Sequence, residues 1–285
     1  MTREIVFEAT PDLKRILARA VLRRGGGGET VPDVRAVRRG IRIDVDHLLD
    51  YARVCGFTVS GSVPLTYPHL LVFPLQVSVM TDRAFPIPLI GSVHVQNVIR
   101  SSRAIAADEV LDAVVWAENL RPHRRGRQVD LVSEVSSGGE VVWREVSTYF
   151  ARGAEHPDAQ RSGAPDLAEL EAVSTGPTWR LGEGTGRAYA AVSGDWNPIH
   201  LHTLTAKALG SPSVIAHGMY TYARVLATLG ARLPADGVTS HVWFRKPLAL
   251  PSSVRVRSVL SAHRTLSLVE SARGDRQHAV IENTW

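Results

Sequence analysis

An internal repeat is the feature that most constrains the fold of this 285-residue chain. Three sequence blocks occur twice in the same order, in the pairs YARVCGF (51–57) with YAAVSGD (189–195), PHLL (68–71) with AHGM (216–219), and SVHV (92–95) with TSHV (239–242). Segments rich in β-branched residues follow the last block of each copy. Because blocks that recur in a constant order indicate duplicated structural units, we expect two copies of one fold.

Each copy has the pattern of a long apolar helix followed by β-strands. In the first copy, HLLVFPLQVSVM follows Pro68, a residue favoured in the first turn of a helix, and Pro74 is expected to kink this helix. The other elements expected in this copy are helices at 12–23 and 45–54, strands at 35–44, 92–98, 109–118, 128–135 and 140–150, and a hairpin turn at 136–139. This order predicts an α+β fold in which an antiparallel sheet wraps around a central helix.

The boundary between the copies follows from composition. The run GAEHPDAQRSGAP, which begins at residue 153, is polar, small and proline-bearing, as linkers are. We therefore expect a first repeat at residues 1–152, a linker at 153–176 and a second repeat at 177–285.

Cysteine content and hydropathy indicate the compartment. Cys55 is the single cysteine, so no internal disulfide can form, which fits a reducing environment. The first residues alternate charged with apolar side chains, and no uncharged apolar run approaches the roughly 18 residues of a membrane span. We expect a cytoplasmic protein without a membrane segment.

The net charge of +5 raises the question of a nucleic-acid partner. The positive charge is nearly all arginine scattered among acids, and the densest cluster, at 121–127, has the composition of a solvated hairpin turn. Since no nucleic-acid-binding motif accompanies it, we expect no nucleic-acid partner. A mildly basic surface also suits an anionic ligand that carries phosphates.

The stretch YAAVSGDWNPIHLHTLTA, at 189–206, concentrates polar side chains between apolar flanks. Pro198 lacks a backbone donor and biases Asn197 away from the α region, so this run cannot be a regular helix. Asp195, Asn197 and His200 therefore lie on an irregular turn, where an acid, an amide and an imidazole can converge as in an active site. Taken singly, each is also an ordinary turn or cap residue.

The repeat provides an internal comparison. Asp195 of the second copy aligns with Phe57 of the first, and Gly218 aligns with Leu70. If Asp195 served the fold alone, both copies would need it. The asymmetry favours a functional role and predicts one active site per chain.

The motif resembles the signature of the MaoC-like dehydratases and (R)-specific enoyl-CoA hydratases. The matching residues are Tyr189, Ser193, Gly194, Asp195, Asn197, Pro198, Ile199, His200 and Ala206. The resemblance is strong over about 178–251 and weak in the first half. It implies a double hotdog fold and a hydro-lyase of fatty acid metabolism that interconverts a trans-2-enoyl thioester and the (R)-3-hydroxyacyl thioester. The first copy would then accommodate the acyl chain.

Catalytic roles follow from the chemistry and the resemblance together. Hydration of an enoyl thioester needs a base, an acid and donors for the enolate oxygen. The resemblance implies that Asp195 and His200 form the acid–base dyad, that Asn197 helps to position the water, and that the Gly218 N–H is the oxyanion donor. Which member of the dyad moves which proton stays open. For Gly218, close helix packing is the alternative explanation.

Further candidates for substrate binding each have a structural alternative. Ser193 completes a turn or contacts substrate, Trp196 packs or walls the pocket, and His217 packs at the helix start or touches ligand. Arg245 and Lys246 contact the phosphates of coenzyme A or form a solvated strand end.

The expected partner is an acyl-CoA or acyl-carrier-protein thioester, and we expect a homodimer. The histidines near the motif have no recognisable metal-ligand spacing, so no metal is expected, and coenzyme A enters only as part of the substrate. Two alternatives remain: a dehydratase of carrier-bound or non-fatty acyl chains, and a thioester-binding protein without turnover.

Overall fold

The computed structural model describes residues 2–13, 16, 28–160, 163–173 and 175–285. The helix expected at 12–23 therefore lies almost entirely outside the described residues. The chain divides into two compact units. Unit 1 comprises residues 1–44 and 61–163, and unit 2 comprises residues 45–60 and 164–285.

Unit 1 is a six-stranded sheet on a central helix. Its strands, in sheet order, are β1 (Arg3–Val6), β2 (Val34–Arg42), β4 (Val110–His123), β5 (Gly126–Ser137), β6 (Glu140–Arg152) and β3 (Val93–Ser101). Only the β1–β2 pair is parallel among the pairs of described residues in this unit. The expected hairpin at 136–139 is confirmed, because Gly138 and Gly139 adopt φ of 59° and 86° between β5 and β6.

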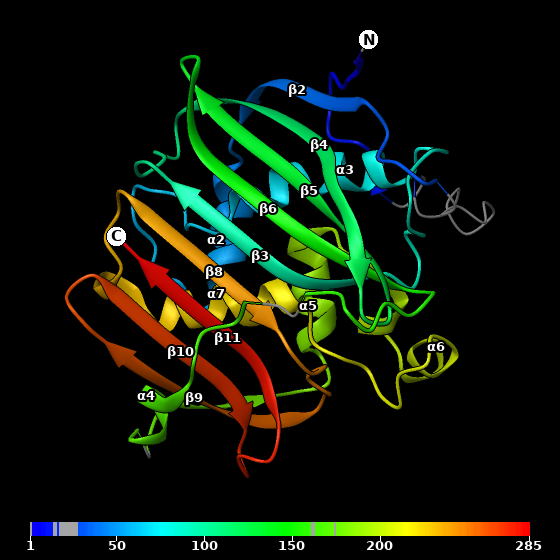
Figure 1. The fold of residues 1–285 in the computed structure, drawn as a ribbon. Coiled ribbons are helices and arrows are strands. Elements are labelled where there is room, and N and C mark those ends of the chain that lie inside the picture. The colour runs from blue at the N-terminus through cyan, green and yellow to red at the C-terminus, as the bar shows by residue number, and fades with distance from the viewer. Residues whose placement is uncertain (1, 14–15, 17–27, 161–162, 174) are drawn as a thin grey trace. The chain divides into compact units, whose positions relative to one another are not determined.

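The central helix of unit 1 is α3 (Pro68–Met80). It begins at Pro68 as predicted and continues through Pro74. Most of its residues are buried on all sides, which is typical of a helix in the middle of a core. It packs against β2, β4 and β5, and Figure 1 shows it behind the strands of its unit.

Unit 2 repeats this arrangement. Its antiparallel sheet has, in order, β8 (Val238–Phe244), β11 (Gln277–Thr284), β10 (Arg264–Ser271), β9 (Ser252–Leu260) and β7 (Thr178–Leu181). The helices and 3-10 turns are α2 (Val45–Cys55), α4 (Ala168–Glu171), α5 (Thr185–Ser193), η1 (Pro198–His200), α6 (Thr203–Ala208), α7 (Gly218–Leu229) and η2 (Gly230–Arg232). The central helix is α7, which packs against β11.

The structural repeat follows the sequence repeat. In each copy a short helix, α2 or α5, ends at a glycine in the left-handed region, Gly56 (φ 84°) or Gly194 (φ 71°). A long helix and four antiparallel strands follow in each copy, so the predicted α+β double hotdog is confirmed.

Residues 45–60 differ from the sequence-based division, because α2 packs in unit 2 although it belongs to the first repeat. Its buried face contacts α5, where the ring centroids of Tyr51 and Tyr189 lie 6.4 Å apart. His47 Nε2 donates to the Val192 carbonyl at 2.7 Å. An amphipathic helix is stable only where its apolar face is covered, and here α5 covers it.

The expected linker at 153–176 is only partly a connection. The boundary between the units falls at residues 163 and 164, and α4 follows it. Leu170 of α4 is fully buried against Trp243, Leu266 and Leu268, so the end of the linker belongs to the core of unit 2. None of the described helices is both long and apolar enough to cross a membrane.

A buried carboxylate lies under α3. The side chain of Glu145 on β6 is fully buried and accepts hydrogen bonds from His69 Nδ1 (2.8 Å), Gln76 Nε2 (2.8 Å) and Asn97 Nδ2 (2.6 Å). Burial alone would raise the pKa of Glu145, but the charge of His69 and these hydrogen bonds hold the pKa below its ordinary value. The pair thus stabilises the charged form of the acid.

We expect Glu145→Gln to lower the free energy of unfolding by about 3 kcal/mol, because three buried donors lose a charged acceptor. Since the folded pKa is depressed, this stabilisation is present above the unfolded pKa and is lost as pH falls through the folded value. Urea denaturation at pH 7 and below pH 4 measures both effects. Glu134→Gln is the control, because Glu134 pairs with Arg144 at 3.2 Å where both are partly exposed. An equal loss in both variants would contradict the assignment.

Candidate active site

The motif lies on the irregular turn that the sequence predicts. Helix α5 ends at Ser193, and Gly194 reverses the chain in the left-handed conformation. The Trp196 N–H donates to the Gly194 carbonyl at 3.0 Å, which tightens the turn. The 3-10 turn η1 follows and presents His200 at its end.

The polar side chains of the motif build this turn themselves. Ser193 Oγ accepts from the Asp195 N–H (3.2 Å), Asp195 Oδ1 from the Asn197 N–H (3.1 Å), and Asn197 Oδ1 from the Ile199 N–H (3.3 Å). Each bond spans two residues, as in Asx and related turns. Ser193 and Asn197 therefore have the structural roles considered as alternatives, and the bonds fix the position of the Asp195 carboxylate.

His200 is held in one tautomer. Its Nδ1 lies 2.8 Å from the Ile215 carbonyl, which can only accept, so Nδ1 carries a proton. In the neutral ring, Nε2 is then the basic atom. The Ile215 N–H in turn donates to the Ile199 carbonyl at 3.3 Å, which ties the two segments together. Gly186 of α5 allows the approach, since a Cβ there would lie 2.1 Å from the His200 carbonyl oxygen.

His217 lies against both members of the predicted dyad. Its Nε2 donates to the backbone carbonyl of Asp195 at 3.0 Å and lies 3.8 Å from Asp195 Oδ2. Its ring stacks on His200 with centroids 3.7 Å apart and planes at 27°. Burial, and then the neighbouring charge of His200, lower the pKa of His217 to about 4. His217 is only 3% exposed and is therefore neutral near pH 7.

Asp195, His200 and His217 bring polar atoms within 4.8 Å of one another. A carboxylate and two imidazoles are residue types that bind metal ions. However, the lone pairs of the two stacked rings lie in nearly parallel planes, which disfavours convergence on one ion, and one nitrogen of each ring already donates to a carbonyl. The geometry favours acid–base chemistry, and the absence of a metal stays a prediction.

Gly218 is the first residue of α7. The side chain of the preceding His217 makes no capping hydrogen bond to the helix, so the positive end of the helix dipole has no side-chain cap from that residue. A Cβ at Gly218 would lie 2.9 Å from the Phe244 ring. Close packing against Phe244 thus explains why no side chain fits at this position. A role in binding an oxyanion would depend on the backbone N–H of Gly218.

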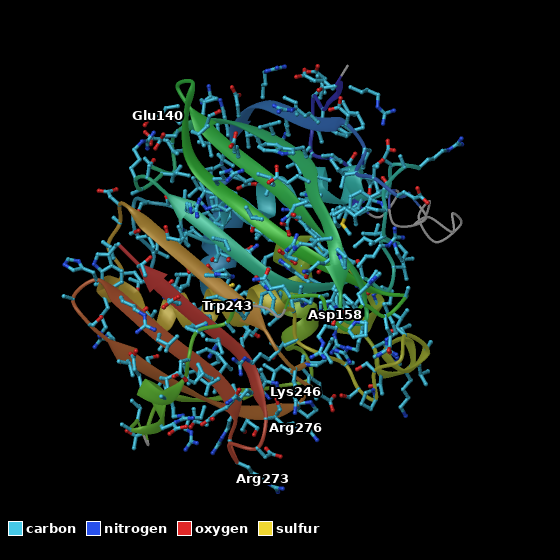
Figure 2. The ribbon with its side chains drawn as sticks, viewed as in Figure 1. Glu140, Asp158, Trp243, Lys246, Arg273 and Arg276 are labelled. Carbon is cyan, nitrogen blue, oxygen red and sulfur yellow. The ribbon has the colours of Figure 1, made fainter. Side chains whose placement is uncertain are left out.

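Basic side chains gather at the end of the unit 2 sheet where Phe244 meets Gly218. Arg245 and Lys246 directly follow β8 and are exposed, and Arg245 hydrogen-bonds Gln277. The β10–β11 turn reaches the same end and carries Arg273 and Arg276, as Figure 2 shows. His278 Nδ1 donates to the Lys246 carbonyl at 3.1 Å, which holds this loop in place.

The structure thus brings Asp195, Asn197, His200 and Gly218 into one region, whereas Arg245 and Lys246 lie at its edge. Trp196 is half-buried beside Asp195. Sequence reasoning did not find the contact of His217 with both dyad members, nor the roles of Ile215 and Phe244. These contacts join residues that are far apart in sequence. The only signal in the sequence was that His217 directly precedes Gly218.

Comparisons with known proteins point to one family. The family described as MaoC like domain matches residues 168–281. The 3-hydroxyacyl-thioester dehydratase X of Mycobacterium tuberculosis is 40% identical over 231 residues, which cover 79% of this chain and 80% of that protein. The 3-hydroxybutyryl-CoA dehydratase of Methylorubrum extorquens is 38% identical over 72 residues, which cover 24% of this chain and 46% of that protein.

Solved structures show the same likeness over a longer stretch. The crystal structure of HtdX from M. tuberculosis superimposes with a TM-score of 0.76 at 34% identity and covers 87% of this chain and 98% of that one. A MaoC-like dehydratase from Phytophthora capsici, at 16% identity and a TM-score of 0.71, covers 88% and 94% and supports the fold alone. On the identity and coverage of its relatives, this chain belongs to the MaoC-like dehydratase family of hydro-lyases.

Proposed function

We propose that the protein interconverts an (R)-3-hydroxyacyl thioester and the corresponding trans-2-enoyl thioester. The observation that carries the proposal is the meeting of the Asp195 carboxylate and a His200 ring with a basic Nε2 beside the N-terminus of α7. The relatives named as dehydratases of hydroxyacyl substrates support the choice of substrate class.

The dehydration begins with removal of the proton on C2. One member of the dyad accepts it while negative charge develops on the thioester oxygen. The Gly218 N–H and the positive end of α7 stabilise this oxygen in our proposal. The other member protonates the 3-hydroxyl group, which leaves as water, and the double bond forms between C2 and C3. Hydration is the reverse sequence.

Each dyad residue has one atom free for proton transfer. His200 Nδ1 is engaged by Ile215, so Nε2 is its exchanging atom. Asp195 Oδ1 accepts from the Asn197 backbone, so we assign the proton transfer to Oδ2. The chemistry is acid–base throughout, and we propose that no metal or separate cofactor takes part.

The basic end of the unit 2 sheet supports coenzyme A as the carrier of the acyl group. Lys246, Arg273 and Arg276 lie there, as Figure 2 shows, and Arg245 precedes Lys246 at the end of β8. Asp275, between Arg273 and Arg276 in sequence, adds a negative charge. Phosphates attract such side chains strongly. An acyl carrier protein presents the same phosphopantetheine phosphate. Comparison of the rates on the enoyl-CoA and on the enoyl thioester of the carrier protein distinguishes the two carriers.

The dyad predicts the first result. Asp195→Asn and His200→Gln should each lower kcat for enoyl-CoA hydration by about 10³-fold, because each removes one proton-transfer step. Loss of enoyl absorbance measures the rate. His202→Gln is the matched control, since this exposed imidazole only caps α6 by accepting from the Leu204 N–H. Wild-type protein that binds enoyl-CoA without turnover would favour the binding-protein alternative.

The glycine at the start of α7 predicts a second result. Gly218→Ala should lower kcat by about 10²-fold, because the new Cβ meets Phe244 and displaces the N–H donor. Combining it with Phe244→Leu, which makes room, should restore part of the activity. Gly182→Ala is the control, since nothing lies within 4 Å of a Cβ there. Unchanged kcat in Gly218→Ala would remove Gly218 from the oxyanion site.

The basic end predicts a third result. Lys246→Glu should raise KM for an enoyl-CoA about 10-fold at low salt, with kcat within about 2-fold, and high salt should reduce the difference. The N-acetylcysteamine thioester, which lacks phosphates, should show no change. Arg232→Glu is the control, because this exposed residue lies in η2, before β8 begins, whereas Lys246 follows the end of β8. Equal effects on both thioesters would show that Lys246 does not contact phosphate.

A further inference from the structure

We propose that His217 is a positioning residue, a neutral imidazole that holds the side chains of Asp195 and His200 in place so that both can act on one substrate. The proposal rests on the function proposed above and assigns a role to a buried residue that takes no part in proton transfer there. It is carried by two contacts, the Nε2 hydrogen bond to the Asp195 carbonyl and the stacked ring of His200.

His217 contacts or adjoins each of the three groups of the site. Its backbone leads directly into Gly218, its Nε2 holds the turn that carries Asp195, and its ring face covers one side of His200. The neighbouring segment is itself anchored, since the Ala216 N–H donates to the Leu248 carbonyl at 2.8 Å. Displacement of His217 would therefore move all three catalytic groups.

The hydrogen bonds show which nitrogen of His217 carries the ring proton. His217 Nε2 donates to a carbonyl, so the neutral ring has its proton there. His217 Nδ1 is buried and has no hydrogen-bond partner among the described residues. A second proton on Nδ1 would be a buried donor without an acceptor, and it would add a charge 3.7 Å from the centre of the His200 ring.

The groups that face His217 also favour its neutral form. They are Asp195, His200 and the ring of Tyr189, whose centroid lies 4.9 Å away. Asp195 favours a charged His217, but burial and the charge of His200 oppose it more strongly and lower the pKa of His217 to about 4. His217 therefore stays neutral while His200 exchanges protons.

The first copy separates this role from simple packing. His69 occupies the equivalent place at the start of α3, and there the imidazole donates from Nδ1 to the Glu145 carboxylate. The second copy uses the other ring nitrogen, and its acceptor is the backbone of the proposed catalytic acid. A histidine needed only to fill space at the helix start would not require this change of partner.

Three substitutions separate the two contacts. His217→Gln retains an N–H donor, His217→Phe retains a flat ring, and His217→Ala removes both. We expect kcat for enoyl-CoA hydration to fall about 100-fold in His217→Ala and about 10-fold in the other two, with KM within about 3-fold. Partial rescue by Gln and Phe distinguishes positioning from a loss of packing.

The matched control is His241→Gln. The pKa of His241 is also lowered to about 4 by burial, and its ring stacks on Trp243 with centroids 3.5 Å apart. It lies on the opposite face of β8 from Phe244, because the two positions differ by three residues. This variant should keep kcat within about 2-fold.

Histidine ¹⁵N NMR of the unaltered protein gives a readout that does not depend on activity. His217 should appear as a neutral ring protonated at Nε2 from pH 5.5 to 8. Titration of His217 in that range would overturn the proposal, as would kcat within 2-fold of wild type in all three variants. If wild-type protein hydrates no enoyl thioester, the proposed function fails, whereas the NMR result still decides whether His217 has the assigned protonation.

Discussion

The hydrogen bond from His200 Nδ1 to the Ile215 carbonyl is the contact on which the site depends. It joins the turn after α5 to the segment that leads into α7, and these segments are separated by α6. A carbonyl is an acceptor only, so the bond fixes both the orientation and the tautomer of the ring. The same segment presents His217 and Gly218, and one backbone path therefore positions the His200 ring, the His217 ring stacked on it and the N-terminus of α7.

The sequence predicted the parts of the fold that local chemistry determines. The repeat, the central helices and the irregular turn at Pro198 follow from patterns within a few residues. It did not predict that α2 packs in unit 2, because an amphipathic face does not specify which neighbour covers it. The stack of His217 on His200 and the contact of Phe244 with Gly218 were equally inaccessible, since they depend on how distant segments pack.

The carboxylates of Glu145 and Asp195 differ in how far they are exposed to solvent. In unit 1, Glu145 is fully buried and surrounded by donors, so its charge is satisfied internally and serves stability. In unit 2, Asp195 keeps 28% of its side chain exposed and accepts one backbone bond at Oδ1. A carboxylate that is fully satisfied cannot exchange protons readily, whereas a partly open one can. The exposure of Asp195 thus distinguishes it from acids that only stabilise the fold, such as Glu145 in unit 1 and the buried Glu270 in unit 2.

The unpaired Nδ1 of His217 has a physical consequence for the site. A buried acceptor without a donor is unfavourable by about 1–3 kcal/mol, and native proteins contain few of them among their buried polar atoms. Phenylalanine of similar shape would avoid this cost but could not donate to Asp195. An imidazole at this position therefore costs stability but holds the turn that carries Asp195. Unfavourable buried groups of this kind concentrate where geometry matters more than the free energy of folding.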